Sequence, residues 1–307
     1  MTSISAEPND CPALSVVIPT RNRGDVIRRA VESVLQSPRP DLEVVVVDDG
    51  STDDTIVQLS QLSDRRFRFH RLESGGNANR ARNAGARLSR GSLIAFLDSD
   101  DAFRAGRVER LIGFFLRWPD VDALVDGYVE FARGKEQVHR MPRVTPDRAQ
   151  IAYMLIAHLV PLTNSAITIR RPAFESVDGY DEAMFRHQDR ELLLRLSVNH
   201  SIWFGDETDV EKYRGGSSIS HNYDGYIAGL DALAARFPDF RSPENDQIFR
   251  YLVVRGIVKA MTTGRWAAAY RELRQWRHTE HLPKDFFGCF RAYRNGRRQR
   301  SLARHRG

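Results

Sequence analysis

The chain has 307 residues, 41% of them hydrophobic and 28% charged, and its mean hydropathy is −0.46. This length predicts one large α/β domain or two modest ones. The two cysteines, Cys11 and Cys289, lie near opposite ends, which excludes a disulfide framework and is typical of free thiols in a reducing compartment. No stretch approaches 18 uncharged apolar residues, and the polar residues 1–12 lack a signal-peptide core. We therefore expect a cytoplasmic protein without a transmembrane helix.

The formal net charge of +6 arises at the C-terminal end of the chain. Residues 290–307 contain seven arginines and no acidic residue, and without these arginines 39 basic residues stand against 40 acidic ones. A nucleic-acid-binding domain would spread its basic charge over a folded face, so we expect no nucleic-acid partner. Residues 285–307 form a basic tail that suits either a peripheral contact with an anionic membrane surface or a solvated terminus.

The first half of the chain alternates strand and helix patterns. Short apolar runs predict buried strands at 14–18, 44–47 and 93–97, and an alternating pattern predicts a further strand at 67–72. Apolar residues recur at helical spacing within 26–35, 56–62, 78–88 and 108–115. This alternation predicts a mostly parallel central sheet flanked by helices, with ligands bound at the carboxyl ends of its strands.

The second half is less regular. The patterns predict a strand within 121–131, a polar loop at 133–147, a helix at 149–159, a strand at 166–170 and a short helix at 191–196. From Tyr223 onward they are helical, over 227–237 and 248–276. We expect a disordered N-terminus (1–13), an α/β domain (14–222), a helical C-terminal extension (223–284) and the basic tail (285–307).

Polar clusters follow three of the predicted strands. Asp98-Ser-Asp-Asp101 places three carboxylates on one turn, where they repel one another unless a cation or hydrogen bonds compensate. Oxygen ligands of this type suit Mg²⁺ or Mn²⁺ shared with substrate phosphates, although a solvated acidic turn is the alternative. Asp48-Asp-Gly-Ser51 is either a tight turn or a source of a carboxylate that accepts a hydrogen bond from a nucleobase or a ribose.

The third cluster, Pro19-Thr-Arg-Asn-Arg23, ends the first strand. It is not a glycine-rich phosphate loop, and neither G-x-G-x-x-G nor G-x-x-x-x-G-K-[ST] occurs anywhere in the chain. These absences argue against a standard Rossmann dehydrogenase and a P-loop NTPase. A bound nucleotide would have to be held by side chains and a metal ion.

Taken together, these segments resemble the inverting glycosyltransferases of family 2, which have the GT-A fold. The matching segments are Val16-Val-Ile-Pro-Thr-Arg-Asn-Arg23, Val45-Val-Val-Asp-Asp-Gly-Ser-Thr-Asp53, Ala81-Arg-Asn-Ala-Gly85 and Phe96-Leu-Asp-Ser-Asp-Asp101. Residues 171–182, 188–195 and 213–220 resemble the segments before, at and after the family's catalytic acidic motif. The resemblance covers about residues 14–221 and implies a nucleotide-binding half (14–120) and an acceptor-side half (121–222).

The resemblance implies a metal-dependent, inverting transfer of a sugar from a nucleotide-diphosphate donor, expected to be a UDP-sugar, to an acceptor hydroxyl. The acceptor would be a saccharide or a lipid-linked molecule, in surface polysaccharide or glycoconjugate biosynthesis. The implied nucleotide-binding residues are Pro19, Thr20, Asn22, Asp49, Arg82, Asp98 and Asp100. Mn²⁺ or Mg²⁺ would be held by Asp100 and Asp101, with Asp101 expected as the direct ligand, although which of the carboxylates at 98, 100 and 101 binds the ion stays open. Asp189 would be the general base.

The chain departs from the family pattern in two places. Gln188 stands where the family usually has Glu, which leaves Asp189 as the base because Glu191 falls about half a turn away. The histidine that the family often carries in its closing segment is absent at Gly215-Gly216, so His221 is the substitute metal ligand or a surface histidine. His187, beside the acidic motif, is equally ambiguous.

Two other functions remain open. A sugar-phosphate nucleotidyltransferase shares the sheet type, but it would need a glycine-rich loop with Lys or Arg after the first strand. A degenerate transferase fold that serves as a binding or scaffold module is favoured by Gln188 and opposed by the retained carboxylates. The family's processive synthases carry a Gln-x-x-Arg-Trp motif and transmembrane helices. Arg265-Trp266 lacks the glutamine, so we expect transfer of one or a few sugars.

Overall fold

The computed structural model describes residues 11–73, 75–132, 134–142, 147–214, 225–243 and 245–276, together with residues 285, 288 and 291. The strands are β1 (Leu14–Thr20), β2 (Leu42–Asp48), β3 (Phe67–Arg71), β4 (Leu93–Phe96), β5 (Ala102–Phe103), β6 (Ala123–Val125), β7 (Tyr128–Ala132), β8 (Lys135–His139), β9 (Ile167–Arg170), β10 (Ile202–Phe204) and β11 (Val210–Tyr213). The helices are α1 (Ile27–Leu35), α2 (Thr55–Ser60), α3 (Ala78–Leu88), α4 (Arg107–Arg117), α5 (Arg148–Ile156), α6 (Arg171–Ser176), α7 (Gln188–Asn199), α8 (Tyr226–Arg236), α9 (Asp246–Thr262) and α10 (Trp266–Trp276).

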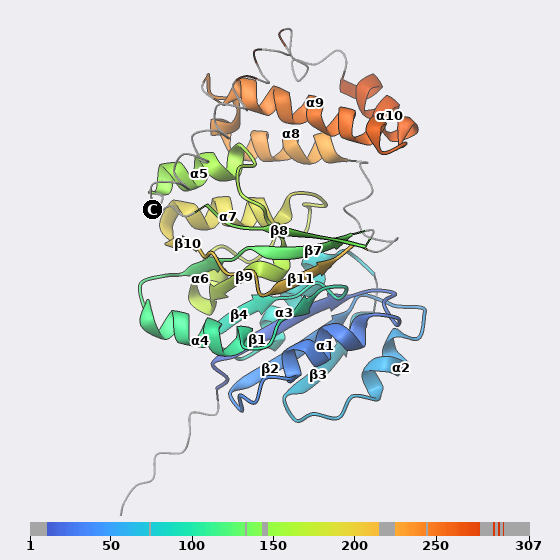
Figure 1. Cartoon of the computed structure of the whole chain (residues 1–307), viewed down its shortest axis with the longest axis vertical. Coiled ribbons are helices and arrows are strands. Elements are labelled where there is room, and N and C mark those ends of the chain that lie inside the picture. The colour runs from blue at the N-terminus through green and yellow to red at the C-terminus, as the bar shows by residue number, and fades with distance from the viewer. Residues whose placement is uncertain are drawn as a thin grey trace, which may run out of the picture.

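A seven-stranded sheet forms the centre of the molecule, in the order β10-β6-β9-β4-β1-β2-β3 (Figure 1). Its strands are parallel except for β9, which runs antiparallel to both neighbours, β4 and β6. The apolar runs of β1, β2 and β4 are buried on both faces of this sheet, as parallel strands covered by helices require. The prediction of a mostly parallel α/β sheet is therefore confirmed.

The two faces of β1 pack into different cores. Val16 and Ile18 join the core formed with α1 and α4, whereas Val17 joins the core that also contains residues of α5, α7, α8 and α9. This division follows from the alternation of side chains along a strand. The second of these cores runs without interruption from the sheet into the helices after residue 225.

A second sheet of four strands, in the order β5-β11-β7-β8, lies beside the central one. The prediction of a loop at 133–147 is wrong for residues 135–139, because β8 pairs antiparallel with β7 there. This strand has no apolar alternation to reveal it, since most of its side chains are exposed. The sheet brings β11 beside β5, directly after the acidic turn at 98–101.

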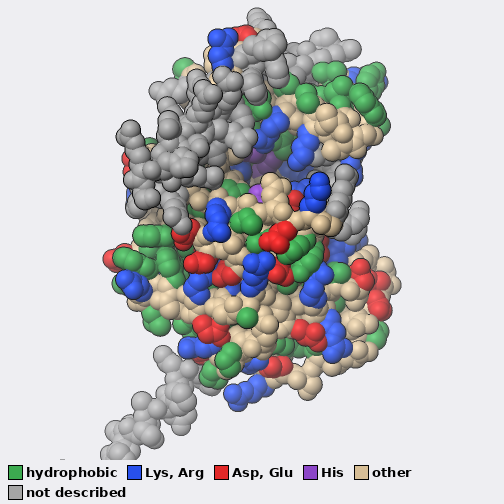
Figure 2. Space-filling model, in the orientation of Figure 1, with side chains coloured by type: hydrophobic (Ala, Val, Ile, Leu, Met, Phe, Trp, Pro, Cys, Tyr) green, Lys and Arg blue, Asp and Glu red, His purple; other side chains and the backbone are tan. Residues whose placement is uncertain are grey.

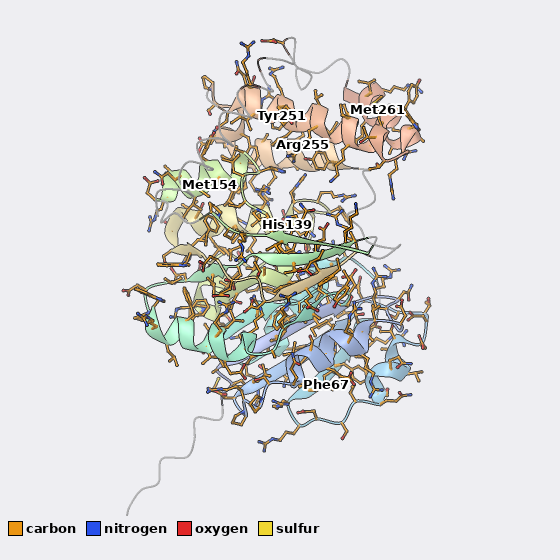
Figure 3. All side chains as sticks on the ribbon, viewed as in Figure 1. Phe67, His139, Met154, Tyr251, Arg255 and Met261 are labelled. Carbon is orange, nitrogen blue, oxygen red and sulfur yellow. The ribbon has the colours of Figure 1, made fainter. Side chains whose placement is uncertain are left out.

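The described part of the helical extension consists of α8, α9 and α10, which lie on the side of the molecule formed by α5 and α7 (Figure 1). The helical pattern at 248–276 is interrupted at Gly264, whose φ of 77° separates α9 from α10. Met154 of α5 belongs to the same core as the buried residues of α9, and Tyr251 packs against that core (Figure 3). The extension therefore shares a core with the α/β body.

No helix in the described ranges is both long enough and apolar enough to cross a lipid bilayer. Residues 1–10 and most of the basic tail at 285–307 lie outside the described residues, so the expectations for both ends stay predictions.

Candidate functional site

The three polar clusters lie at one edge of the central sheet. Strands β4, β1 and β2 are parallel neighbours, so their carboxyl ends, at Phe96, Thr20 and Asp48, come together. The backbone N–H of Asp49 donates to the carbonyl oxygen of Thr20 at 2.8 Å, which joins two of these ends directly. The convergence expected from the apolar runs is confirmed.

Asn22 holds together the loops after β1 and β2. Its backbone N–H donates to the hydroxyl of Ser51 at 2.8 Å, and its side-chain oxygen accepts from the N–H of Thr52 at 2.8 Å. The residue has a φ of 51°, a left-handed conformation that asparagine tolerates better than most residues. Pro19 and Thr20 are buried at the end of β1, and the Thr20 hydroxyl has no hydrogen-bond partner among the described residues.

The two aspartates at the end of β2 have different partners. The Asp48 carboxylate is fully buried and accepts from the backbone N–H and the hydroxyl of Ser51, so it stabilises the turn. The Asp49 carboxylate accepts from the N–H of Gly76 at 2.9 and 3.0 Å. Asp49 is therefore hydrogen-bonded to the loop that precedes α3.

Arg82 of α3 forms a buried ion pair with Asp98 at the end of β4. One guanidinium nitrogen lies 2.6 Å from the Asp98 carboxylate, and another donates to the side-chain oxygen of Asn79 at 3.0 Å. Burial alone would lower the pKa of Arg82 and raise that of Asp98. The attraction between the two charges outweighs burial, so the pKa of Arg82 is raised and that of Asp98 is lowered.

Asp101 is buried within the protein rather than turned toward solvent. Its carboxylate accepts from the hydroxyl of Ser165 at 2.5 Å and from the backbone N–H of Tyr213 at 3.3 Å. Burial raises the pKa of Asp101 to about 7, although the nearby Lys212 opposes this shift.

Lys212 of β11 is a cation within the acidic turn that the sequence analysis missed. Its ammonium group lies 3.7 Å from the Asp101 carboxylate and donates to the Thr163 hydroxyl at 2.9 Å. Burial would lower the pKa of this lysine, but the charges of Asp101 and Asp98 raise it. The one indication in the sequence is that Lys212 directly precedes the Tyr213-Arg214 segment. The pairing of β11 with β5 that brings it to the turn is invisible in the sequence.

Among the described residues, no three His, Cys, Asp or Glu side chains are grouped closely enough to hold a metal ion by themselves. Asp98 is engaged by Arg82 and Asp101 by Ser165 and Lys212, but no described side chain pairs with the Asp100 carboxylate. Burial and the charge of Asp98 raise the pKa of Asp100, so a nearby cation would be stabilising there. Asp100 thus fits the usual arrangement in which Mg²⁺ or Mn²⁺ is held by one or two carboxylates and by substrate phosphates. His221 lies outside the described residues.

Asp189 lies in the first turn of α7, on the other side of the site. Its side chain is half-buried and accepts from the backbone N–H of Arg190 at 2.8 Å. A helix N-terminus is a favourable place for a negatively charged side chain. Its charge contributes to raising the pKa of Arg82 and of Tyr180.

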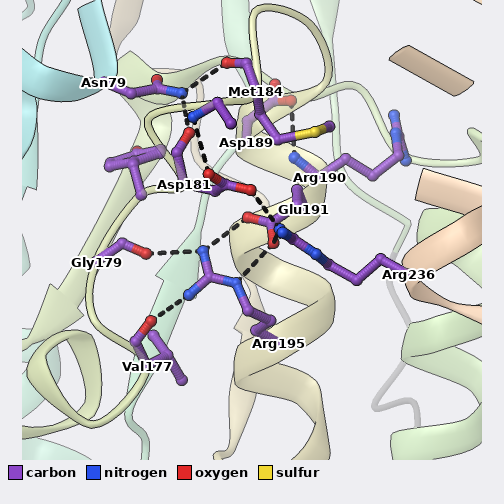
Figure 4. A network of polar contacts seen from close by, with 12 residues as sticks. Asn79, Val177, Gly179, Asp181, Met184, Asp189, Arg190, Glu191, Arg195 and Arg236 are labelled. Atoms are coloured by element: carbon purple, nitrogen blue, oxygen red, sulfur yellow. Dashed lines mark hydrogen bonds and ion pairs between the residues drawn. The ribbon is translucent and has the colours of Figure 1, made fainter. Parts of the chain in front are cut away.

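Glu191, two residues further along α7, is fully committed to ion pairs (Figure 4). Its carboxylate lies 2.6 Å from a guanidinium nitrogen of Arg195 and 2.6 Å from one of Arg236. Arg195 also donates to the carbonyl oxygens of Val177 and Gly179. A carboxylate held in this way cannot reach an acceptor, so the geometry favours Asp189 over Glu191 as the base.

Asn79 joins the two sides of the site. Its side-chain oxygen accepts from Arg82, and its amide nitrogen donates to the carbonyl oxygens of Asp181 and Met184 at 2.8 Å each (Figure 4). The sequence analysis missed this residue, although it lies one helical turn before Arg82. The loop that leads to α7 is therefore tied to the helix that carries Arg82.

His187 packs against the helical extension. Its ring lies 5.3 Å from that of His158 and 5.0 Å from that of Tyr226, measured between centroids. Burial, reinforced by the charge of Arg190, lowers the pKa of His187 to about 3, so the ring is neutral. Figure 2 shows histidine side chains in the hollow between the extension and the body. His187 therefore contributes packing between the body and the extension.

The glycosyl transferase family 2 model matches residues 15–177, which is more than half of the chain. An uncharacterized glycosyltransferase of Rickettsia prowazekii is 27% identical over 205 residues, which cover 65% of this chain and 63% of the relative. A hyaluronan synthase of Pasteurella multocida is 29% identical over 233 residues, 66% of this chain and 22% of the synthase. The chain thus spans less than two thirds of the length of either relative.

Solved structures show the same fold over nearly the whole chain. Staphylococcus aureus TarS 1-349 in complex with UDP-GlcNAc has a TM-score of 0.64 at 18% identity, covering 95% of this chain and 90% of that one. The mannosyltransferase PcManGT from Pyrobaculum calidifontis, in complex with GDP-Man and Mn²⁺, has a TM-score of 0.56 at 16% identity, covering 98% and 87%. With its GT-A fold and the family match over the strand-end motifs, this chain belongs to glycosyl transferase family 2.

Proposed function

We propose that the protein is an inverting, metal-dependent glycosyltransferase that moves a sugar from a UDP-sugar to an acceptor hydroxyl. One observation carries this proposal. Two buried cations and an acidic turn lie at the carboxyl ends of the strands, and Asp189 lies at the N-terminus of a helix whose preceding loop is tied to Arg82 through Asn79. This is the arrangement that a single displacement needs, because the leaving group and the attacking hydroxyl are on opposite sides of the sugar.

In this proposal the donor lies along the strand ends. Pro19, Thr20, Asn22 and Asp49 line the nucleoside pocket, and the unpartnered Thr20 hydroxyl supports that role. Arg82 and Lys212 offset the charge of the diphosphate, which grows as the bond to the sugar breaks. Asp98, held by Arg82, accepts a hydrogen bond from the ribose.

Asp100 would hold a divalent cation together with phosphate oxygens of the donor, and Asp101 would support the turn from beneath. A bound Mn²⁺ or Mg²⁺ supplies further positive charge for the leaving diphosphate. The Mn²⁺ in the mannosyltransferase complex with GDP-Man supports a divalent ion in this fold. The lack of a side-chain partner for the Asp100 carboxylate among the described residues supports this role, since Asp98 and Asp101 are already engaged.

Asp189 removes the proton from the attacking hydroxyl. A positioned general base contributes about 10²–10⁴-fold to the rate. The engagement of Glu191 by two guanidinium groups supports the assignment of this role to Asp189.

The names of the similar proteins support the proposed donor and acceptor. The structural neighbour TarS binds UDP-GlcNAc, and one sequence relative is named a hyaluronan synthase, which supports a UDP-sugar donor and a saccharide acceptor. We propose a role in surface polysaccharide or glycoconjugate biosynthesis, with a saccharide or lipid-linked acceptor. The peripheral membrane contact of the basic tail remains a prediction.

A donor screen tests the proposal. Purified protein with Mn²⁺ is incubated with UDP-GlcNAc, UDP-Gal, UDP-Glc and UDP-GlcA without acceptor, and the release of UDP is measured. We expect slow hydrolysis of at least one donor, and ¹H NMR should show the β-anomer of the released sugar before mutarotation. Release of the α-anomer would contradict an inverting displacement. Tight UDP binding without turnover on any donor would favour the scaffold function instead.

A further inference from the structure

We propose that the helical extension positions the general base, and that Arg236 of α8 is the residue through which it acts. This inference rests on the proposed function, because it assigns a role relative to Asp189. Arg236 touches neither the strand ends nor Asp189 in the described contacts. It is therefore a positioning residue rather than a catalytic one.

The first turn of α7 lacks the local device that usually fixes a helix N-terminus. Its N-cap residue, His187, has a φ of 59° and makes no side-chain hydrogen bond to the first turn. The first N–H groups of a helix have no partners within the helix, and a polar N-cap side chain commonly satisfies one of them. The Asp189 carboxylate accepts from the backbone N–H of Arg190 within α7, and contacts from outside the helix fix the position of its first turn.

Arg236 provides such a contact on the C-terminal side of Asp189. Its guanidinium lies 2.5 Å from the Asp181 carboxylate and 2.6 Å from the Glu191 carboxylate (Figure 4). Glu191 is fully buried in the same helix as Asp189 and two residues beyond it. Arg236 therefore ties the beginning of α7 to the loop that contains Asp181.

The extension also contacts the residues that precede Asp189. A Cβ added at Gly229 of α8 would lie 2.8 Å from Cβ of Arg186 and 3.1 Å from Cδ2 of His187, so the helix backbone packs closely against both residues. Tyr226 of the same helix lies edge-on to the His187 ring. The segment from Arg186 to Glu191 is thus held by α8 on both sides of the base.

The loop that contains Asp181 connects the extension to the helix that carries Arg82. The carboxylate of Asp181 binds Arg236, and the carbonyl oxygen of the same residue accepts from Asn79, which also binds Arg82. The extension, the first turn of α7 and the helix α3 are therefore joined by one polar network. This continuity explains why the extension belongs to the catalytic unit and not to a separate module.

The variant Arg236→Met removes both ion pairs and keeps much of the apolar stem. We expect kcat for UDP-sugar hydrolysis to fall between about tenfold and a hundredfold, as a misplaced catalytic group does. The KM for the donor and the Kd for UDP should change less than about twofold, since the same donor contacts remain. Arg241→Met is the matched control, because Arg241 pairs with Asp246 inside the extension. Its kcat should match the wild type.

A double-mutant cycle with Asp189→Asn decides whether Arg236 acts through the base. If it does, Arg236→Met should lower kcat in the native background and have no further effect on the residual rate of Asp189→Asn. An equal loss in both backgrounds would overturn the inference while leaving the proposed function intact. Wild-type turnover by Asp189→Asn alone would instead overturn the proposed function.

A purely structural role makes a different prediction. Loss of general stability would weaken UDP binding together with kcat, and that result with Arg236→Met would overturn the inference. Asp181→Asn, which weakens only the more exposed of the two ion pairs, provides a milder version of the same test. It should lower kcat less than Arg236→Met does. Arg236→Lys should restore part of kcat because one charge can still reach Glu191.

Discussion

The donor side and the base side of this site are stabilised in different ways. On the donor side, two cations, Arg82 and Lys212, balance the carboxylates of a single acidic turn, and the pKa shifts there show a tight competition of charges. On the base side, the Asp189 carboxylate accepts from the backbone N–H of Arg190, and the two residues Arg186 and His187 that come before the helix pack against α8. From this difference we predict that donor affinity depends on charge, whereas turnover depends on position.

The largest expected effect concerns the charge balance of the acidic turn. Asp100→Asn removes the one carboxylate of the turn that no described side chain engages, and we expect turnover to fall by at least about a hundredfold, because a bound cation contributes several kcal/mol. Mn²⁺ binding in the presence of UDP, measured by electron paramagnetic resonance, should be lost as well. EDTA should produce the same loss of turnover in the wild type. Unchanged Mn²⁺ binding by the variant would show that Asp100 is not a ligand of the metal ion.

The second prediction tests the cation supplied by β11. Lys212→Met should weaken UDP binding by about tenfold to a hundredfold in calorimetry, since a hydrogen bond to a charged group contributes about 1.5–3 kcal/mol. Lys135→Met, on the exposed edge strand β8, serves as the control and should bind UDP like the wild type. If the wild type, Lys212→Met and Lys135→Met bind UDP with equal affinity, Lys212 does not take part in binding the donor.

Substitutions of two glycines, Gly85 and Gly229, should affect stability and turnover differently, because each glycine packs against a different part of the molecule. A Cβ at Gly85 of α3 would lie 2.3 Å from Cγ1 of Val17 on β1, so Gly85→Ala should destabilise the fold by about 1–3 kcal/mol. At Gly229 the added methyl group would press on Arg186 and His187 instead. Gly229→Ala should therefore lower kcat more than donor affinity. Urea unfolding and steady-state kinetics measure the two effects, and the reverse pattern would contradict the comparison.

The last expected effect is a pH dependence of stability from the base side. The folded-state pKa of His187, about 3, lies below the ordinary histidine value, and burial lowers the pKa of His158 as well. Their contribution to stability is therefore present above about pH 6.5 and is lost as the pH falls toward 3, by up to about 1.4 kcal/mol per pH unit for each ring. Arg186, Arg190 and Arg255, which face these rings, reinforce the effect.

Urea unfolding at pH 7.5, 6.0 and 5.0 measures this dependence. His187→Asn, which keeps a residue suited to the left-handed backbone, should show a shallower loss of stability on acidification than the wild type. An identical slope in both proteins would show that His187 does not stay neutral in the folded state.

The donor side was largely predictable from the sequence, for a physical reason. Apolar runs identify buried parallel strands, and parallel strands place their carboxyl ends at one edge, so Thr20, Asp49 and Asp98 had to converge. Each of these residues lies within a few positions of its strand. The short-range pattern therefore contains the information needed to place them.

The remaining parts of the site depend on contacts between distant segments. Tyr213 and Asp101, which hydrogen-bond, are 112 residues apart, and Arg236 and Glu191 are 45 apart. Lys212 reaches the acidic turn only because β11 pairs with β5, and both strands are too short to leave a periodic pattern. Their places follow from tertiary packing, which no local pattern specifies.

One measurement tests the central claim, that charge holds the donor while position sets the base, most directly. Asp189→Asn leaves the strand ends and both cations in place, so calorimetry should give a Kd for UDP within about twofold of the wild type. The rate of UDP release from a UDP-sugar should fall by about 10²–10⁴-fold. If UDP binding and turnover fall together, or if turnover persists, the division of the site into these two sides is wrong.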